Sequence, residues 1–121
     1  MIKYGNFSDI NDEYDEIWLI VRNLKDKSIL NKKNIYWVPE LAPSQELYND
    51  AEKWKRSYQW TIEKYKGEYK PRFLKEMESF KAQTKLNILK QTKKNILLVC
   101  YCTGMKCHRY LIQEIIEKVS F

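Results

Sequence analysis

Long apolar runs, strings of basic residues and a signal peptide are all missing from this sequence. No apolar stretch approaches the roughly 18 residues of a membrane-spanning helix, and the longest, residues 96–102, has the length of a buried strand. Basic runs stop at two residues, as in Lys32-Lys33 and Lys93-Lys94, which argues against a DNA-binding tail. The first residues lack the apolar core of a signal peptide. We therefore expect a cytoplasmic protein with no membrane partner and no nucleic-acid partner.

Cysteine is scarce, and its count is odd. The three cysteines cluster at positions 100, 102 and 107, which does not resemble a disulfide framework and suits a reducing compartment. The single histidine, His108, adjoins the last of them. A zinc site here would need ligands at 107 and 108 to converge from adjacent residues, unlike paired Cys-x-x-Cys knuckles. We expect neither a metal nor a cofactor.

The residues that are present suit one folded domain with an anionic partner. Hydrophobic residues make up 44% of the 121 positions and aromatic residues 14%, which allows a core and argues against disorder. Lysine and arginine exceed aspartate and glutamate by 22 − 16 = 6, giving the formal net charge of +6. Such an excess favours anionic partners without naming one.

Four segments read as strands: residues 1–4, 17–21, 34–38 and 95–102. The second and fourth are continuous apolar runs, as expected of strands covered on both faces. With helices between them, the pattern predicts an α/β fold with a largely parallel sheet. We expect a single compact domain over 1–121, with helices packed on the sheet and a C-terminal strand-turn-helix.

Apolar spacing predicts three helical regions. Ser44 is placed as the N-cap of the first, and Leu47, Ala51, Trp54 and Tyr58 would share its inner face. The pattern continues to Tyr69 until Gly67 and Pro71 interrupt it. A new helix would begin near Pro71, with Phe73, Met77 and Phe80 on its inner stripe. The last helix would begin near Cys107, with an apolar face of Leu111, Ile112, Ile115, Ile116 and Val119.

The turn from the last strand to the last helix is the place where a ligand is expected. In open α/β sheets, ligands bind outside the carboxyl ends of strands. The turn from Thr103 to Lys106 occupies such a place, and Gly104 permits its tight backbone path. The first helical amides point toward a bound anion, and Arg109 adds a forked cation. The alternative is that Arg109 pairs with a surface carboxylate such as Glu13 or Glu16.

A nucleophilic cysteine is the competing interpretation of the same turn. Six residues separate Cys102 from Arg109, one more than in the Cys-x5-Arg phosphatase loop. Cys107 and His108 on one helix would point about 100° apart, a poor geometry for proton transfer. Cys100 reads as a small buried filler. We expect no catalytic residue, while an enzyme using Cys102, Cys107 or His108 on a nucleotide phosphoester or glycosidic bond stays the alternative.

The favoured hypothesis is a protein that binds a small phosphorylated nucleotide. Arg109 and the helix amides would take the phosphates with help from Arg22, His108 would donate from one ring nitrogen, and an aromatic ring would stack on the base or else lie in the core. The candidate ligand-binding residues are Thr103, Gly104, His108, Arg109, Arg22, Trp37, Ser44, Tyr65 and Phe80.

The aromatic residues also predict a homo-oligomer. Four Trp, nine Tyr and four Phe are many for a domain of this size to enclose. Trp60 falls off the Leu47-Trp54-Tyr58 face and needs a second surface, either from another subunit or from a loop of its own chain.

Three ordered segments resemble domain-of-unknown-function family 488. They are WVPELAPSQEL (residues 37–47), EKYKGE (63–68) and the end NILLVCYC…CHRYLI (95–112). This chain departs from the family pattern at Lys64, commonly Arg, and at Cys102, where some members carry an acidic residue. The resemblance implies a compact α/β fold and little about function.

In size and C-terminal motif the chain is also similar to phage proteins that defeat the Thoeris defence by sequestering a cyclic ADP-ribose signal. That second resemblance implies a non-catalytic nucleotide sponge in a bacterial host cell.

Overall fold

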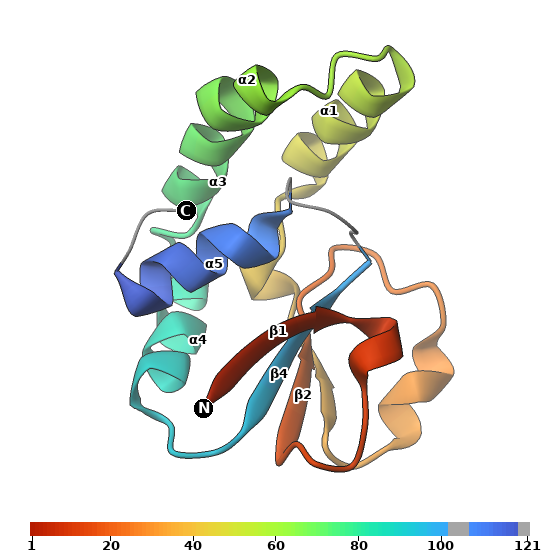
Figure 1. Cartoon of the computed structure of the whole chain (residues 1–121), viewed down its shortest axis with the longest axis vertical. Helices are drawn as coiled ribbons and strands as arrows, with labels where there is room; N and C mark the ends of the chain where they lie inside the picture. The colour runs from red at the N-terminus through yellow and green to blue at the C-terminus, as the bar shows by residue number, and fades with distance from the viewer. Residues whose placement is uncertain (102–106, 119–121) are drawn as a thin grey trace.

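Four parallel strands form one sheet, which fills the lower half of the view in Figure 1, with helices beside it and above it. The computed structural model describes residues 1–101 and 107–118. Strands β1 (Ile2–Asn6), β2 (Glu16–Leu19), β3 (Ile35–Trp37) and β4 (Ile96–Cys100) have the order β1-β4-β2-β3, and each neighbouring pair is parallel. The α/β class, the parallel sheet and the C-terminal helix expected from the sequence are confirmed.

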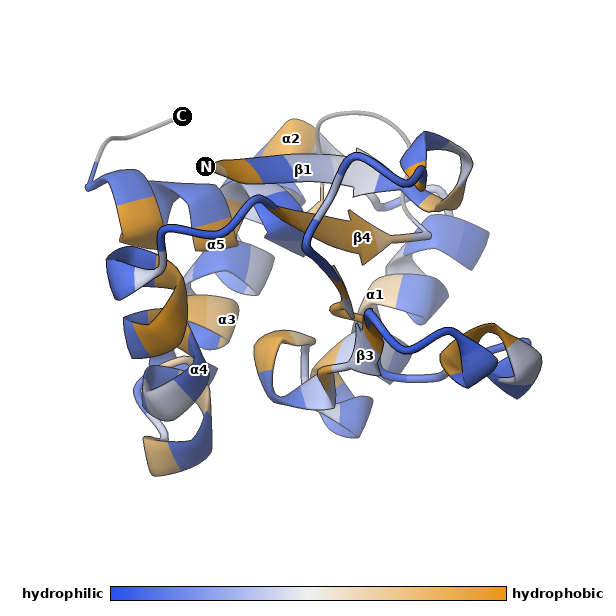
Figure 2. Cartoon of the chain, turned by 90° about the horizontal axis from the view of Figure 1, so that it is seen from below, coloured by the Kyte–Doolittle hydropathy of each residue, from blue (hydrophilic) through white to orange (hydrophobic). Residues whose placement is uncertain are grey.

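Strand β4 occupies the middle of the sheet because its residues can be buried on both faces. All five are buried, and Figure 2 shows the strand coloured as hydrophobic along its length. Ile96 lies opposite both Ile2 of β1 and Glu16 of β2, so three segments distant in sequence meet there. A continuous apolar run is what a doubly covered parallel strand requires.

Five α-helices and four short helical turns are seen in the described residues. The α-helices are α1 (Gln45–Arg56), α2 (Ile62–Lys64), α3 (Lys70–Glu76), α4 (Phe80–Gln91) and α5 (His108–Glu117). The turns are η1 (Phe7–Asp9), η2 (Lys27–Asn31), η3 (Pro39–Leu41) and the π-helical η4 (Tyr65–Tyr69). Helix α5 contacts β1 and β4 and packs against α3 and α4, so it joins the sheet to the other helices (Figure 1).

Ser44 caps α1, as the sequence predicts. Its Oγ accepts a hydrogen bond from the Leu47 amide at 3.2 Å. The Glu76 carboxylate in turn accepts from the Ser44 amide at 2.8 Å and from the Ser44 hydroxyl. This serine therefore ties the start of α1 to the end of α3 and satisfies an otherwise free helical amide.

Tyr58 does not lie on the apolar face of α1, so that expectation was wrong. The helix ends at Arg56, and Tyr58 is in the left-handed region with φ 59° and is 94% exposed. The amide of Tyr58 donates to the carbonyl of Lys55, and the amide of Gln59 donates to that of Trp54. These two bonds form a Schellman end, which stops the helix and turns Tyr58 outward.

Gly67 and Pro71 do not break the next helix. A π-helical turn connects α2 to α3, and the Lys70 amide donates to the carbonyl of Tyr65, five residues back. Pro71 has no amide hydrogen to donate, and it lies in the first turn of α3, as expected of a proline.

Phe80 does not share a stripe with Phe73 and Met77, which corrects a second expectation. Phe73 and Met77 are buried, whereas Phe80 is 86% exposed. The reason is that α3 ends at Glu76 and Ser79 caps a separate helix, α4, so Phe80 begins a new element.

Candidate functional site

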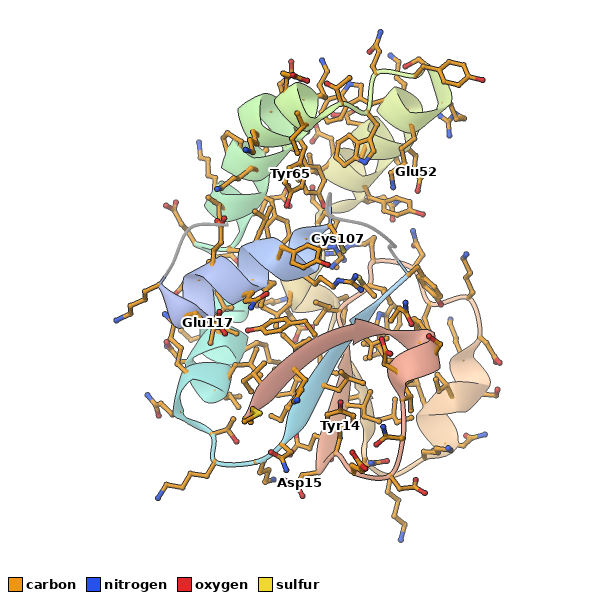
Figure 3. The ribbon with its side chains drawn as sticks, viewed as in Figure 1. Tyr14, Asp15, Glu52, Tyr65, Cys107 and Glu117 are labelled. Atoms are coloured by element: carbon orange, nitrogen blue, oxygen red, sulfur yellow. The ribbon has the colours of Figure 1, made fainter. Side chains whose placement is uncertain are left out.

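A cavity of about 250 Å³ lies at the carboxyl edge of the sheet. Its wall is built from the chain after β2, Pro43 with one face of α1, Trp60, Tyr69 at the end of the π-turn, the residue after β4 and the first residue of α5. Figure 3 shows Glu52 on α1 and Cys107 beside the start of α5 in this half of the molecule, with Asp15 at the opposite end of the sheet. The position agrees with where ligands bind in open α/β sheets.

Aromatic side chains form much of the cavity wall. Trp60 stacks on Trp54 with ring centroids 6.0 Å apart and meets Tyr69 edge to face at 5.3 Å. Across the cavity, Tyr101 stacks on Phe7 at 4.5 Å, and its hydroxyl accepts from the Lys25 amide at 2.8 Å. Tyr48 adds a fourth aromatic side chain to the lining. The rings of Trp60 and Tyr101 are thus fixed by their neighbours before any ligand arrives.

Three cations and one carboxylate share this wall. The Nζ of Lys25 lies 4.6 Å from the centroid of the Tyr101 ring, and the Nζ of Lys55 lies 5.7 Å from that of Trp60. Glu52 lies 3.9 Å from Lys55, in a pair exposed enough to contribute little stability. Arg22 donates to the carbonyls of Pro43 at 2.8 Å and Pro39 at 3.0 Å, so it also braces the entry to α1.

His108 is buried at the inner wall of the cavity. Its Nε2 lies 2.6 Å from the carbonyl oxygen of Ile20, which only accepts, so Nε2 carries the hydrogen. In the neutral ring Nδ1 is then an acceptor, and it lies 3.8 Å from Sγ of Cys107. The expectation that these two side chains diverge was wrong, because Cys107 is the extended N-cap residue (φ −134°, ψ 144°) and not part of the helix.

Cys100, Cys107 and Arg109 form a buried cluster beside this wall. The two sulfur atoms are 2.9 Å apart, and Nη1 of Arg109 donates to Cys100 at 3.8 Å. Arg109 also donates to the Tyr110 hydroxyl at 3.3 Å. Burial works against the charge of Arg109, but the bond to Tyr110 and the two nearby sulfur atoms raise its pKa above the ordinary value. Cys100 is fully buried, as expected.

The structure brings only part of the predicted site together. Arg22 and His108 line the cavity, and Arg109 is not among its lining residues. Glu16, one of the carboxylates considered for Arg109, lies at the other edge of the sheet and accepts from Lys94. Thr103, Gly104 and Cys102 lie outside the described residues.

The predicted aromatic and capping residues lie away from the cavity. Tyr65 is in the core, where its hydroxyl donates to the carbonyl of Cys107 at 3.1 Å. Trp37 donates to the carbonyl of Val21 at the sheet edge, and Phe80 is exposed on α4. Ser44, besides capping α1, borders a second hollow that lies between η3 and the start of α4.

Most residues that line the cavity were not predicted from the sequence, although one helical spacing pattern indicated them. Tyr48, Glu52 and Lys55 follow each other at spacings of four and three, so they share a helical face beside the buried Leu47 and Ala51. Trp60 proved to be covered by Trp54, Tyr65 and Tyr69 of its own chain. That packing removes the argument from Trp60 for a second subunit, and the homo-oligomer stays a prediction.

Fold and site together define a small parallel α/β domain with an aromatic and cationic cavity at the carboxyl edge of its sheet. The chain belongs to the DUF488-N3a family, described as the active DUF488-N3 subclade, whose model matches residues 3–120. No curated protein and no solved structure matches the chain. Among the described residues, no helix is long and apolar enough to cross a membrane.

Proposed function

We propose that this protein binds a small phosphorylated nucleotide in the cavity at the carboxyl edge of the sheet. The observation that carries the proposal is the pairing of cations with aromatic faces along one wall, Lys25 with Tyr101 and Lys55 with Trp60. Each ammonium group occupies a place where a nucleobase can stack. A base entering over the ring displaces the ammonium, which then reaches the phosphate of the same ligand.

The rest of the lining matches the other parts of a nucleotide. The Glu52 carboxylate can accept hydrogen bonds from ribose hydroxyls, as acidic residues do in dinucleotide-binding folds. A cavity of about 250 Å³ encloses a base with its sugar and leaves the phosphates near the exposed lysines at the rim. The net charge of +6 favours the approach of an anion.

Sequestration without chemistry is the form of this function that we favour. A protein that holds a cyclic ADP-ribose type of signal would counteract bacterial antiviral immune signalling by lowering the free concentration of that signal. Binding alone needs aromatic rings, cations and a concave wall, and these are the features of the cavity. We assign the phosphate contacts to Lys25 and Lys55 in place of Arg109, because Arg109 is not among the lining residues.

Equilibrium dialysis with ADP-ribose, cyclic ADP-ribose and AMP tests the proposal. The double variant Lys25→Ala/Lys55→Ala should weaken binding by about 10- to 100-fold, since hydrogen bonds to charged groups contribute about 1.5–3 kcal/mol. Lys93→Ala is the control for a change of surface charge: it removes one exposed lysine at the opposite edge of the sheet, and its affinity should equal that of the wild type. Equal loss in the control, or no binding of any of the three nucleotides to the wild type, would contradict the proposal.

A second candidate function is chemistry on the bound nucleotide. Two observations favour it: the description of the family as the active subclade, and the 3.8 Å separation of the Cys107 thiol from the acceptor Nδ1 of His108. The bond from Nε2 to Ile20 fixes the ring so that Nδ1 faces the thiol. Such a pair has the form of a nucleophile with its base. Of the two, His108 lines the cavity, whereas Cys107 is buried behind it.

Mass analysis of the bound nucleotide separates the two functions. The protein is incubated with each nucleotide, denatured by heat, and the released molecule is weighed. Intact nucleotide supports sequestration. Altered nucleotide that Cys107→Ser releases unaltered, while binding it with wild-type affinity, would establish the enzyme in its place.

A further inference from the structure

The sulfur atoms of Cys100 and Cys107 contact each other, and neither proposed function uses that contact. Cys100 ends β4 and Cys107 caps α5, and their sulfur atoms are 2.9 Å apart in a buried place. A disulfide bond is about 2.0 Å long, so the sulfur atoms need to approach by less than about 1 Å to become bonded. The pair is therefore positioned for a covalent link between the last strand and the last helix.

The groups around the pair favour the reactive form of the thiols. The Arg109 guanidinium donates to Cys100 at 3.8 Å and so favours a negative charge on that sulfur. Nδ1 of His108, 3.8 Å from Cys107, is the acceptor for the proton of the other thiol. Arg109 thus stabilises a thiolate at Cys100, and His108 can accept the proton of Cys107. Loss of the thiol proton is the step that precedes thiol–disulfide exchange.

We propose that Cys100 and Cys107 form a reversible intramolecular disulfide by exchange with a low-molecular-weight disulfide. Cys107 is only 1% exposed, so the start of α5 opens locally before the step. The thiolate of Cys107 then attacks one sulfur of the oxidant, a mixed disulfide forms, and the first small thiolate leaves. The thiolate of Cys100 then attacks the Cys107 sulfur of the mixed disulfide, and the second small thiolate leaves. Two protein thiols are oxidised by two electrons, one oxidant disulfide is reduced, and the two protons pass to the two small thiols released.

The link would act on the wall of the cavity. Tyr101 follows Cys100 and His108 follows Cys107, and both line the cavity. Oxidation also removes the thiol hydrogen of Cys107, which faces Nδ1 of His108. The disulfide itself is independent of any ligand, so the test below uses the protein alone and does not depend on the proposed nucleotide binding.

Alkylation after equilibration in glutathione redox buffers tests the pairing. The main protein is Cys102→Ser, which keeps both members of the pair and removes the third cysteine of the chain. After acid quenching, the protein is unfolded, treated with N-ethylmaleimide and weighed. Cys102→Ser should change from two alkyl groups to none as the proportion of oxidised glutathione rises, and excess reduced glutathione should restore both.

Two further variants identify the atoms involved. Cys102→Ser/Cys100→Ser and Cys102→Ser/Cys107→Ser each keep one thiol, and neither should form an intramolecular link. If Cys102→Ser keeps both thiols alkylatable, or carries only mixed glutathione disulfides across the whole range, the proposal is overturned. A link that appears in the wild type and maps to Cys102 would overturn it as well.

Discussion

Glu16 shows how a single carboxylate is held at the amino edge of the sheet. The indole Nε1 of Trp18 and the Nζ of Lys94 each donate to it at 2.8 Å. Burial raises the pKa of Glu16, but the bonds from Lys94 and Trp18 and the charge of Lys94 outweigh burial, so the pKa lies below its ordinary value. Lowering of a carboxyl pKa in the folded state means that the ionised form stabilises the fold.

The first prediction at this scale concerns pH. The unfolded-state pKa of a glutamate is about 4.3, so the contribution of Glu16 is complete above that value and is lost as pH falls through the lower folded-state pKa. Glu16→Gln should lower the free energy of unfolding at pH 7 by up to about 1 kcal/mol, and its difference from the wild type should shrink below about pH 4. Urea unfolding at a series of pH values measures this. Glu78→Gln, at an exposed position, is the control, and an equal pH dependence of that variant would show that the effect is general charge.

At the scale of elements, the π-turn joins α2 and α3 without using the conformational freedom of its glycine. An added Cβ on Gly67 would meet nothing within 4 Å, and this residue of the π-turn does not have the positive φ that favours glycine. Gly5 in β1 is the opposite case, since its Cβ would lie 2.6 Å from Oδ2 of Asp9. That oxygen accepts the Asn6 amide at 2.8 Å as part of the cap of η1.

The two glycines therefore predict substitutions of opposite sign. Gly67→Ala should raise the free energy of unfolding by about 0.5–1 kcal/mol, because alanine loses less conformational entropy in a helix. Gly5→Ala should lower it by about 0.5–2 kcal/mol, because Asp9 must move and its capping bond is lost. Chemical denaturation of both variants beside the wild type measures the difference. Destabilisation by Gly67→Ala would show that the π-turn depends on the glycine.

What the sequence predicts at this scale depends on how local the determinant is. The two apolar runs predicted β2 and β4, and Ser44 predicted the start of α1, because each signal lies within the element itself. The left-handed conformation of Tyr58 and the π-turn were missed, since both are set by backbone bonds at helix ends that no apolar pattern records. Sequence spacing also misjudged Cys107 and His108, because one extended residue changed the angle between them.

The cavity was the least predictable feature because it exists only in the whole molecule. Lys25 and Tyr101 are 76 positions apart and meet through a 2.8 Å bond from the Lys25 amide to the tyrosine hydroxyl. Trp60 reaches the same cavity from beyond the end of α1. Of the predicted residues, Arg22 and His108 were found there because both follow from one general rule, that ligands gather at the carboxyl ends of parallel strands.

Because distant segments share the cavity wall, a bound nucleotide should stabilise the entire domain. Unfolding of α1, of the π-turn or of the start of α5 would each remove part of the wall, so the ligand binds the folded state alone.

At 100 times its Kd a ligand adds about 2.7 kcal/mol to the free energy of unfolding, which corresponds to a rise in Tm of about 10 °C for a domain of this size. Differential scanning calorimetry with the tightest-binding of ADP-ribose, cyclic ADP-ribose and AMP measures the shift. Lys93→Ala should show the full rise. Lys25→Ala/Lys55→Ala binds about 10- to 100-fold more weakly, so at the same concentration its Tm should rise by only about 1–5 °C. A full rise in the double variant would place the nucleotide elsewhere on the molecule.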